Sequence, residues 1–282
     1  MRSLQWYKRG AAYEQIRRRR RYQMRTIILK YDETILKNIK NRRLVVCVDS
    51  LDNIESQYVE SSRANDVMAI VVKLPYMSVS DIEFKEEWKQ IPLIIVAHNI
   101  GDYFRFFTKV DDIRHLNIRI FLCNKSNMVF SDLKIMSSLG VDCGLNIEEG
   151  FKMDEEKLLD FASYYFMSPV PHASVEPFEF ILRHLSDEAN SSFGMVLFDD
   201  PLQYIEVTSP DDIDSSELSD SDFFSLKLDS YYSHFMKLDD CAKCAAFKIC
   251  NHKMSDKMDN CSKTMSEIYE YAELRNDINK NH

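Results

Sequence analysis

Glycine is scarce in this chain, with six residues among 282, roughly 2% against an average near 7%. No two of these glycines have the spacing of a phosphate-binding loop or of a dinucleotide-binding fingerprint, so both of those nucleotide-binding motifs are excluded. A β-rich fold built on tight glycine turns is also disfavoured. The scarcity of glycine therefore excludes two nucleotide-binding motifs and makes a fold built on tight turns unlikely.

Long apolar runs are also absent. The longest, at 91–97, has seven residues, whereas a membrane-spanning helix needs about 20. The N-terminus has basic residues but no apolar stretch typical of a secretory signal. We therefore expect no membrane association and a cytoplasmic location. The seven cysteines then point away from a disulfide framework.

Charge is distributed very unevenly along the sequence. Residues 1–43 carry 14 basic and 3 acidic side chains (net +11), and the rest carries 22 basic and 42 acidic ones (net −20), which together give the total of −9. We expect residues 1–42 to form a mostly helical, surface-lying basic segment that faces the acidic body. Docking of an acidic peptide stays open. Binding of nucleic acid is disfavoured because no aromatic stacking motif accompanies the arginine run at 17–21.

Residues 43–190 have the pattern of alternating strands and helices. Continuous β-branched runs of this kind are typical of strands buried on both faces of a parallel sheet. Their spacing leaves room for a helix in each gap, so the sequence predicts an α/β fold built as a partial (β/α) barrel. The predicted strands lie near 44–48, 69–73, 92–97, 118–122 and 144–147, and gap helices are predicted at 81–89, 102–107 and 132–139.

Two further helices follow from apolar residues at helical spacing, at 154–167 and from 177 to 184 and beyond. The runs 195–198 and 204–207 flank Asp199, Asp200 and Pro201 and predict a hairpin. Residues 209–222 are acidic and rich in small residues, which predicts a surface linker. We expect residues 191–282 to form a small C-terminal lobe that contains this linker.

The most informative segment holds four cysteines, Cys241, Cys244, Cys250 and Cys261, in the spacing C-x2-C-x5-C-x10-C. A C-x2-C turn lets two thiolates converge on one metal centre, and four thiolates suit either tetrahedral zinc or an iron–sulfur cluster. The spacing alone does not separate these two cofactors. His252 is a possible substitute ligand.

This segment resembles the C-terminal SPASM domain of radical S-adenosylmethionine peptide maturases, whose pattern is C-x2-C-x5-C-x3-C followed by a further cysteine. The resemblance implies that Cys241, Cys244, Cys250 and Cys261 bind one auxiliary 4Fe-4S cluster. A second auxiliary cluster is not expected, because Met254 occupies the x3-C position and no cysteine lies between Cys143 and Cys241. The resemblance extends over about residues 43–270, although outside the cysteine segment it is a likeness of fold alone.

The chain departs from this family at the cluster that cleaves S-adenosylmethionine. That cluster needs C-x3-C-x2-C after the first barrel strand, and here Cys47 is followed at those positions by Leu51 and Ile54. The resemblance therefore implies a degenerate member of the family, without radical chemistry. It implies an accessory protein of ribosomal peptide maturation, which binds a precursor peptide or a partner maturase.

Two alternatives remain at this stage. The chain is an enzyme that uses the auxiliary cluster or the barrel mouth, or it is a binding module stapled by zinc. Other candidate groups are weaker: His98, His172 and Asp49 are expected to serve structural roles, and the carboxylates of Asp199 and Asp200 to lie in the hairpin turn.

Overall fold

The structure is a computed structural model, and it describes residues 25–125, 128–147, 151–185, 204–209, 241, 243–246, 250 and 258–280. Several predicted features lie outside these residues: the arginine run, the first hairpin strand with Asp199 and Asp200, almost all of the acidic linker, His252 and Met254.

Eight parallel strands form one sheet in the order β7-β6-β5-β4-β3-β2-β1-β8. Strands that are consecutive in the chain are neighbours from β1 to β7, which is the strand order of a (β/α) barrel. Among the described residues, β7 and β8 are the two edge strands of this sheet and do not pair with each other. The strands are β1 (Thr26–Lys30), β2 (Arg43–Val48), β3 (Asp66–Leu74), β4 (Leu93–Ala97), β5 (Arg119–Cys123), β6 (Cys143–Asn146), β7 (Val175–Glu176) and β8 (Tyr204–Val207).

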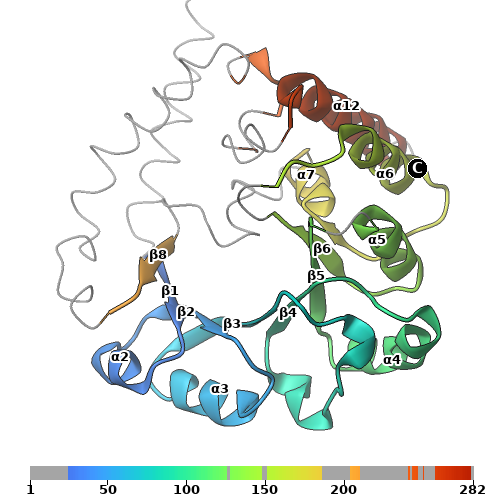
Figure 1. The fold of residues 1–282 in the computed structure, drawn as a ribbon. Helices are drawn as coiled ribbons and strands as arrows, with labels where there is room; N and C mark the ends of the chain where they lie inside the picture. Colours follow the sequence, from blue (N-terminus) through green and yellow to red (C-terminus); the bar gives the residue numbers. More distant parts are fainter. Residues whose placement is uncertain are drawn as a thin grey trace, which may run out of the picture.

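Helices follow most of the strands, and Figure 1 shows α2 to α6 along the outer side of an arc of strands. The α/β class, the parallel pairing and the five predicted strands are confirmed. The helices are α2 (Glu33–Asn38), α3 (Ile54–Ser62), α4 (Tyr103–His115), α5 (Val129–Ser138), α6 (Glu155–Met167), α7 (Phe178–Leu185) and α12 (Cys261–Lys280), with 3-10 helices η1 (Val79–Asp81) and η2 (Glu86–Gln90).

Each central strand buries both faces. In β2, Leu44, Val46 and Val48 join the main core, which lies between the sheet and the helices. Val45 instead joins a smaller cluster on the opposite face of the sheet, with Cys47 packed against it. This two-sided burial explains why the strands are continuous apolar runs rather than alternating ones.

The predicted helical segment 1–42 is wrong for residues 26–30, which form β1 between β2 and β8. Ile27 and Leu29 are buried in the main core. Burial of this short apolar run outweighs the basic character of its surroundings. The apolar run at 27–29 alone would predict a strand, but the high positive charge around it indicates an exposed segment instead.

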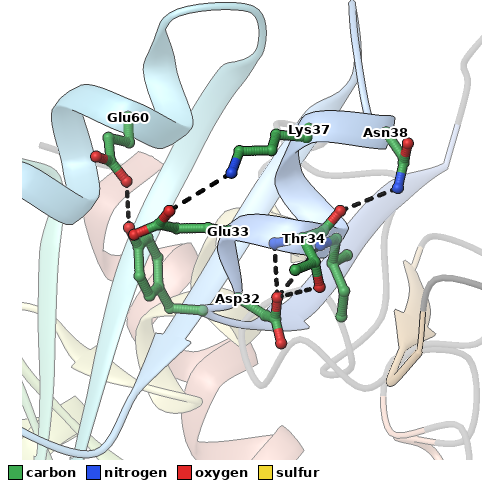
Figure 2. Close-up of polar contacts among 8 residues, drawn as sticks. Asp32, Glu33, Thr34, Lys37, Asn38 and Glu60 are labelled. Carbon is green, nitrogen blue, oxygen red and sulfur yellow. Dashed lines mark hydrogen bonds and ion pairs between the residues drawn. The ribbon is translucent and has the colours of Figure 1, made fainter.

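Helix α2 begins after β1 because Asp32 caps it. The Asp32 carboxylate accepts the backbone N–H of Thr34 at 2.7 Å and that of Ile35 at 3.3 Å (Figure 2). The Tyr31 hydroxyl donates to Glu60 on α3, and burial together with this carboxylate raises the pKa of Tyr31 to about 12. These contacts fix α2 against α3 at the start of the sheet.

The predicted helix at 81–89 is also wrong. Two 3-10 turns, η1 and η2, connect β3 to β4. Val79, Ile82 and Trp88 are buried, so this connection is held close to the core by its apolar side chains. The other two gap helices are confirmed, and the first, α4, extends to His115.

Strand β8 pairs with β1 in parallel, so residues 204–207 belong to the sheet and not to a separate C-terminal lobe. Farther along the chain, Ala246, Cys250, Met265 and Ile268 join the same main core as the strands. Ala246 and Cys250 of the cysteine segment therefore pack on the body of the α/β fold.

Candidate metal centre

The four cysteines lie around the start of α12. Cys261 is the first residue of this helix. The backbone N–H of Cys244 donates to the carbonyl of Cys241 at 3.2 Å, which closes the C-x2-C segment into a turn. The N–H of Cys250 donates to the carbonyl of Ala246 at 2.8 Å, and Cys250 is buried.

The sulfurs influence one another electrostatically. Burial raises the pKa of the Cys261 thiol, and the charges of Cys250, Cys244 and Cys241 raise it further. All three therefore lie within electrostatic range of Cys261. None of the seven cysteines is in a disulfide bond. A positively charged centre would relieve the repulsion among four thiolates, so the chemistry of this set of donors fits a thiolate-bound metal.

In the part of the chain that the structure describes, no three or more His, Cys, Asp or Glu side chains are grouped so as to hold a metal ion. The four cysteines are thus not assembled into a metal-holding group in the described part of the chain.

A carboxylate on helix α6 of the α/β body holds the start of α12. Glu155, in the first turn of α6, accepts the backbone N–H groups of Asp259 at 2.7 Å and of Asn260 at 2.9 Å through Oε1. Its Oε2 accepts the Thr264 hydroxyl at 2.7 Å. These hydrogen bonds lower the pKa of Glu155. We call these four residues the Glu155 clasp. It caps α12 from a different helix.

Ser266 connects α12 to the C-x2-C turn. Its hydroxyl oxygen lies 3.4 Å from the N–H of Ala245, which donates to it, and its hydroxyl donates to the Cys244 sulfur at 4.0 Å. The helix that begins with Cys261 therefore also positions Cys244.

The other three cysteines lie apart from this segment. Cys47 is half-buried on β2, and burial raises the pKa of its thiol. Cys123 and Cys143 are buried in the sheet. Leu51 packs against the main core, and Ile54 is fully buried at the start of α3. Apolar packing thus fills both positions where a cluster after the first predicted strand would need thiolates.

The weaker candidates have separate surroundings. Asp49 forms an ion pair with Lys30. His98 follows β4 and donates its backbone N–H to Met77 at 2.9 Å. His172 lies against the Tyr164 ring at 4.7 Å between centroids and stacks on Tyr165 at 6.1 Å. Burial, and to a lesser extent the charge of Arg275, lowers the pKa of His172.

Sequence reasoning missed Glu155 and Ser266. An acidic residue in the first turn of a helix has an obvious local use at that helix's own N-terminus. Its partners at Asp259 and Asn260 lie more than 100 residues away in sequence. The missed strand β1 likewise brings Lys30 beside Cys47 in register.

Comparison of the chain with protein-family models, with curated proteins and with solved structures finds no match. The class that the structure defines is an α/β protein with an eight-stranded parallel sheet. Among the described residues, no helix combines the length and apolar character that crossing a membrane requires.

Proposed function

We propose that this chain is an iron–sulfur-binding accessory protein of ribosomal peptide maturation, related to SPASM-domain maturases, which binds a precursor peptide or a partner maturase. Cys241, Cys244, Cys250 and Cys261 would hold one 4Fe-4S cluster. The observation that supports the proposal is the cysteine spacing together with the contacts between the C-x2-C turn and α12. Ser266 of this helix accepts the N–H of Ala245 at 3.4 Å and donates to the Cys244 sulfur at 4.0 Å. A cytoplasmic location is part of the proposal, and the absence of disulfide bonds among the seven cysteines is compatible with it.

We prefer a cluster to the zinc alternative because the cysteine spacing resembles that of the SPASM domain. Four thiolates suit either tetrahedral zinc or an iron–sulfur cluster, and among the described residues no group that could hold a metal ion is found.

A bound cluster would supply one-electron redox chemistry and a covalent tie between the C-x2-C turn and α12. The residues of the chain itself would position the ligands. Glu155 holds the helix start at which Cys261 lies, and Ser266 holds the turn at which Cys244 lies.

The proposal excludes cleavage of S-adenosylmethionine by this chain. Leu51 and Ile54 are packed in the core, so Cys47 has no thiolate neighbours at the family's positions. Such a chain would contribute binding, while an intact maturase supplies the radical chemistry.

Two experiments test these roles. The iron-loaded chain is incubated with S-adenosylmethionine and a strong reductant, and we expect no 5′-deoxyadenosine; its formation would contradict the accessory role. The chain is also co-expressed with a short peptide, or with an intact radical maturase, encoded beside its gene. We expect co-purification, and loss of association when the neighbour is replaced by an unrelated peptide. Equal recovery of both peptides would contradict a specific partner.

A further inference from the structure

We infer that Glu155 is a positioning residue of the cysteine site, which holds Cys261 in place from the barrel and couples the occupancy of the site to the first turn of α6. This inference rests on the proposed function. It adds a residue outside the cysteine segment and a means by which the site acts on the barrel.

The Glu155 clasp is specific in its geometry. One carboxylate oxygen accepts the two consecutive N–H groups of Asp259 and Asn260, and the other accepts the Thr264 hydroxyl. Asn260 directly precedes Cys261, so these bonds fix the backbone from which the cysteine side chain extends. Thr264 is buried at 2% exposure. This contact therefore lies where water competes least with the hydrogen bond.

A second contact reinforces the clasp from the same loop. Lys152 forms an ion pair with Asp259, whose N–H already donates to Glu155. The Lys125 ammonium lies over the neighbouring Phe151 ring, 4.8 Å from the ring centroid. Lys125 follows the end of β5. Residues 151–155 therefore connect the start of α12 to a loop at the carboxyl end of the sheet.

Coupling must act in both directions. If Glu155 makes Cys261 a better ligand, occupancy of the site must equally stabilise the clasp and the first turn of α6. The cysteine site would then order a loop at the carboxyl edge, where (β/α) barrels bind their ligands. Residues that orient metal ligands typically contribute 10–100-fold in metal affinity.

The test compares Glu155→Ala with Glu156→Ala in the full-length chain. Glu156 is the next residue in the same helical turn, its side chain is exposed, and its removal changes the net charge equally. Both proteins are reconstituted anaerobically with iron and sulfide, and the release of iron to a chelator is followed. We expect release from Glu155→Ala to be about 10–100-fold faster than from Glu156→Ala. Equal rates would overturn the inference.

A second readout separates positioning from general stability. Amide exchange is measured with and without iron, and we expect iron to slow exchange at residues 155–158 and 259–264 of the wild type but not of Glu155→Ala. Iron-dependent protection that persists unchanged in the variant would overturn the coupling.

Two milder variants serve if Glu155→Ala does not fold. Glu155→Gln keeps an oxygen that can accept the two N–H groups, and Thr264→Val removes a single hydroxyl. We expect both variants to release iron faster than Glu156→Ala does. If Glu155→Ala folds, their rates should be slower than its rate. Wild-type rates in both would overturn the inference. A wild-type chain that retains no iron would overturn the proposed function itself, before any variant is compared.

Discussion

The indole N–H of Trp88 donates to the Glu55 carboxylate at 2.8 Å, which ties the connection between β3 and β4 to helix α3. Trp88 is fully buried, and the Phe84 ring meets it edge-on at 6.3 Å between centroids. This bond lets a large, partly polar side chain fill the space between η2 and α3.

Replacing Glu55 by Ala should leave the buried Trp88 indole without an acceptor. An unsatisfied buried donor costs about 1–3 kcal/mol in the free energy of unfolding. Urea unfolding followed by tryptophan fluorescence measures this loss, with Glu55→Gln as the control that keeps an acceptor oxygen. A Glu55→Ala variant as stable as Glu55→Gln would show that the bond contributes nothing.

Two N-terminal truncations should distinguish the contribution of β1 from that of the residues before it. Removing residues 1–30 deletes β1, which pairs with both β2 and β8, and we expect this protein to lose cooperative unfolding. Removing residues 1–24 retains β1, and we expect it to weaken partner binding while bound iron is unchanged. Loss of iron in the shorter truncation would contradict this expectation.

His172 should make the chain less stable in mild acid. Its pKa is lowered by burial and by Arg275, so the unfolded chain binds a proton more readily than the folded one does. Stability contributed by the neutral ring is present at neutral pH and is lost as pH falls below the ordinary histidine value of about 6.5.

The facing groups that set this behaviour are Tyr164, Tyr165 and Arg275. The free energy of unfolding is measured between pH 7.5 and 5 for the wild type and for His172→Phe. We expect the wild type to lose more stability over this range than the variant does. Parallel curves would mean that His172 titrates alike in the folded and unfolded chains.

Much of the fold could be predicted because buried parallel strands leave a direct mark on the sequence. The runs at 44–48 and 92–97 need no knowledge of their neighbours, since burial on both faces requires apolar residues throughout. Strand β1 is harder to recognise, because its short apolar run lies inside a strongly basic segment that is typical of an exposed surface. The position of β8 could not be predicted, because pairing with β1 joins residues about 180 apart, such as Ile27 and Ile205.

The candidate site, too, could be predicted only in part from the sequence. The cysteine spacing identified four possible ligands, since ligands close in sequence produce a motif. The Glu155 clasp depends on a contact between α6 and α12, and a single carboxylate leaves no such motif. Local patterns therefore indicate candidate ligands, while contacts such as those of Glu155 can be found only in the packed structure.

The central claim is tested most directly by measuring bound iron and sulfide in matched cysteine variants after anaerobic reconstitution. Each of Cys241, Cys244, Cys250 and Cys261 is replaced by Ser in one set, and each of Cys47, Cys123 and Cys143 in the other. The account predicts about four iron atoms per wild-type chain with visible iron–sulfide absorption, loss of iron in the first set, and retention in the second. Equal iron content in the two sets, or a colourless wild type that binds only zinc, would contradict it.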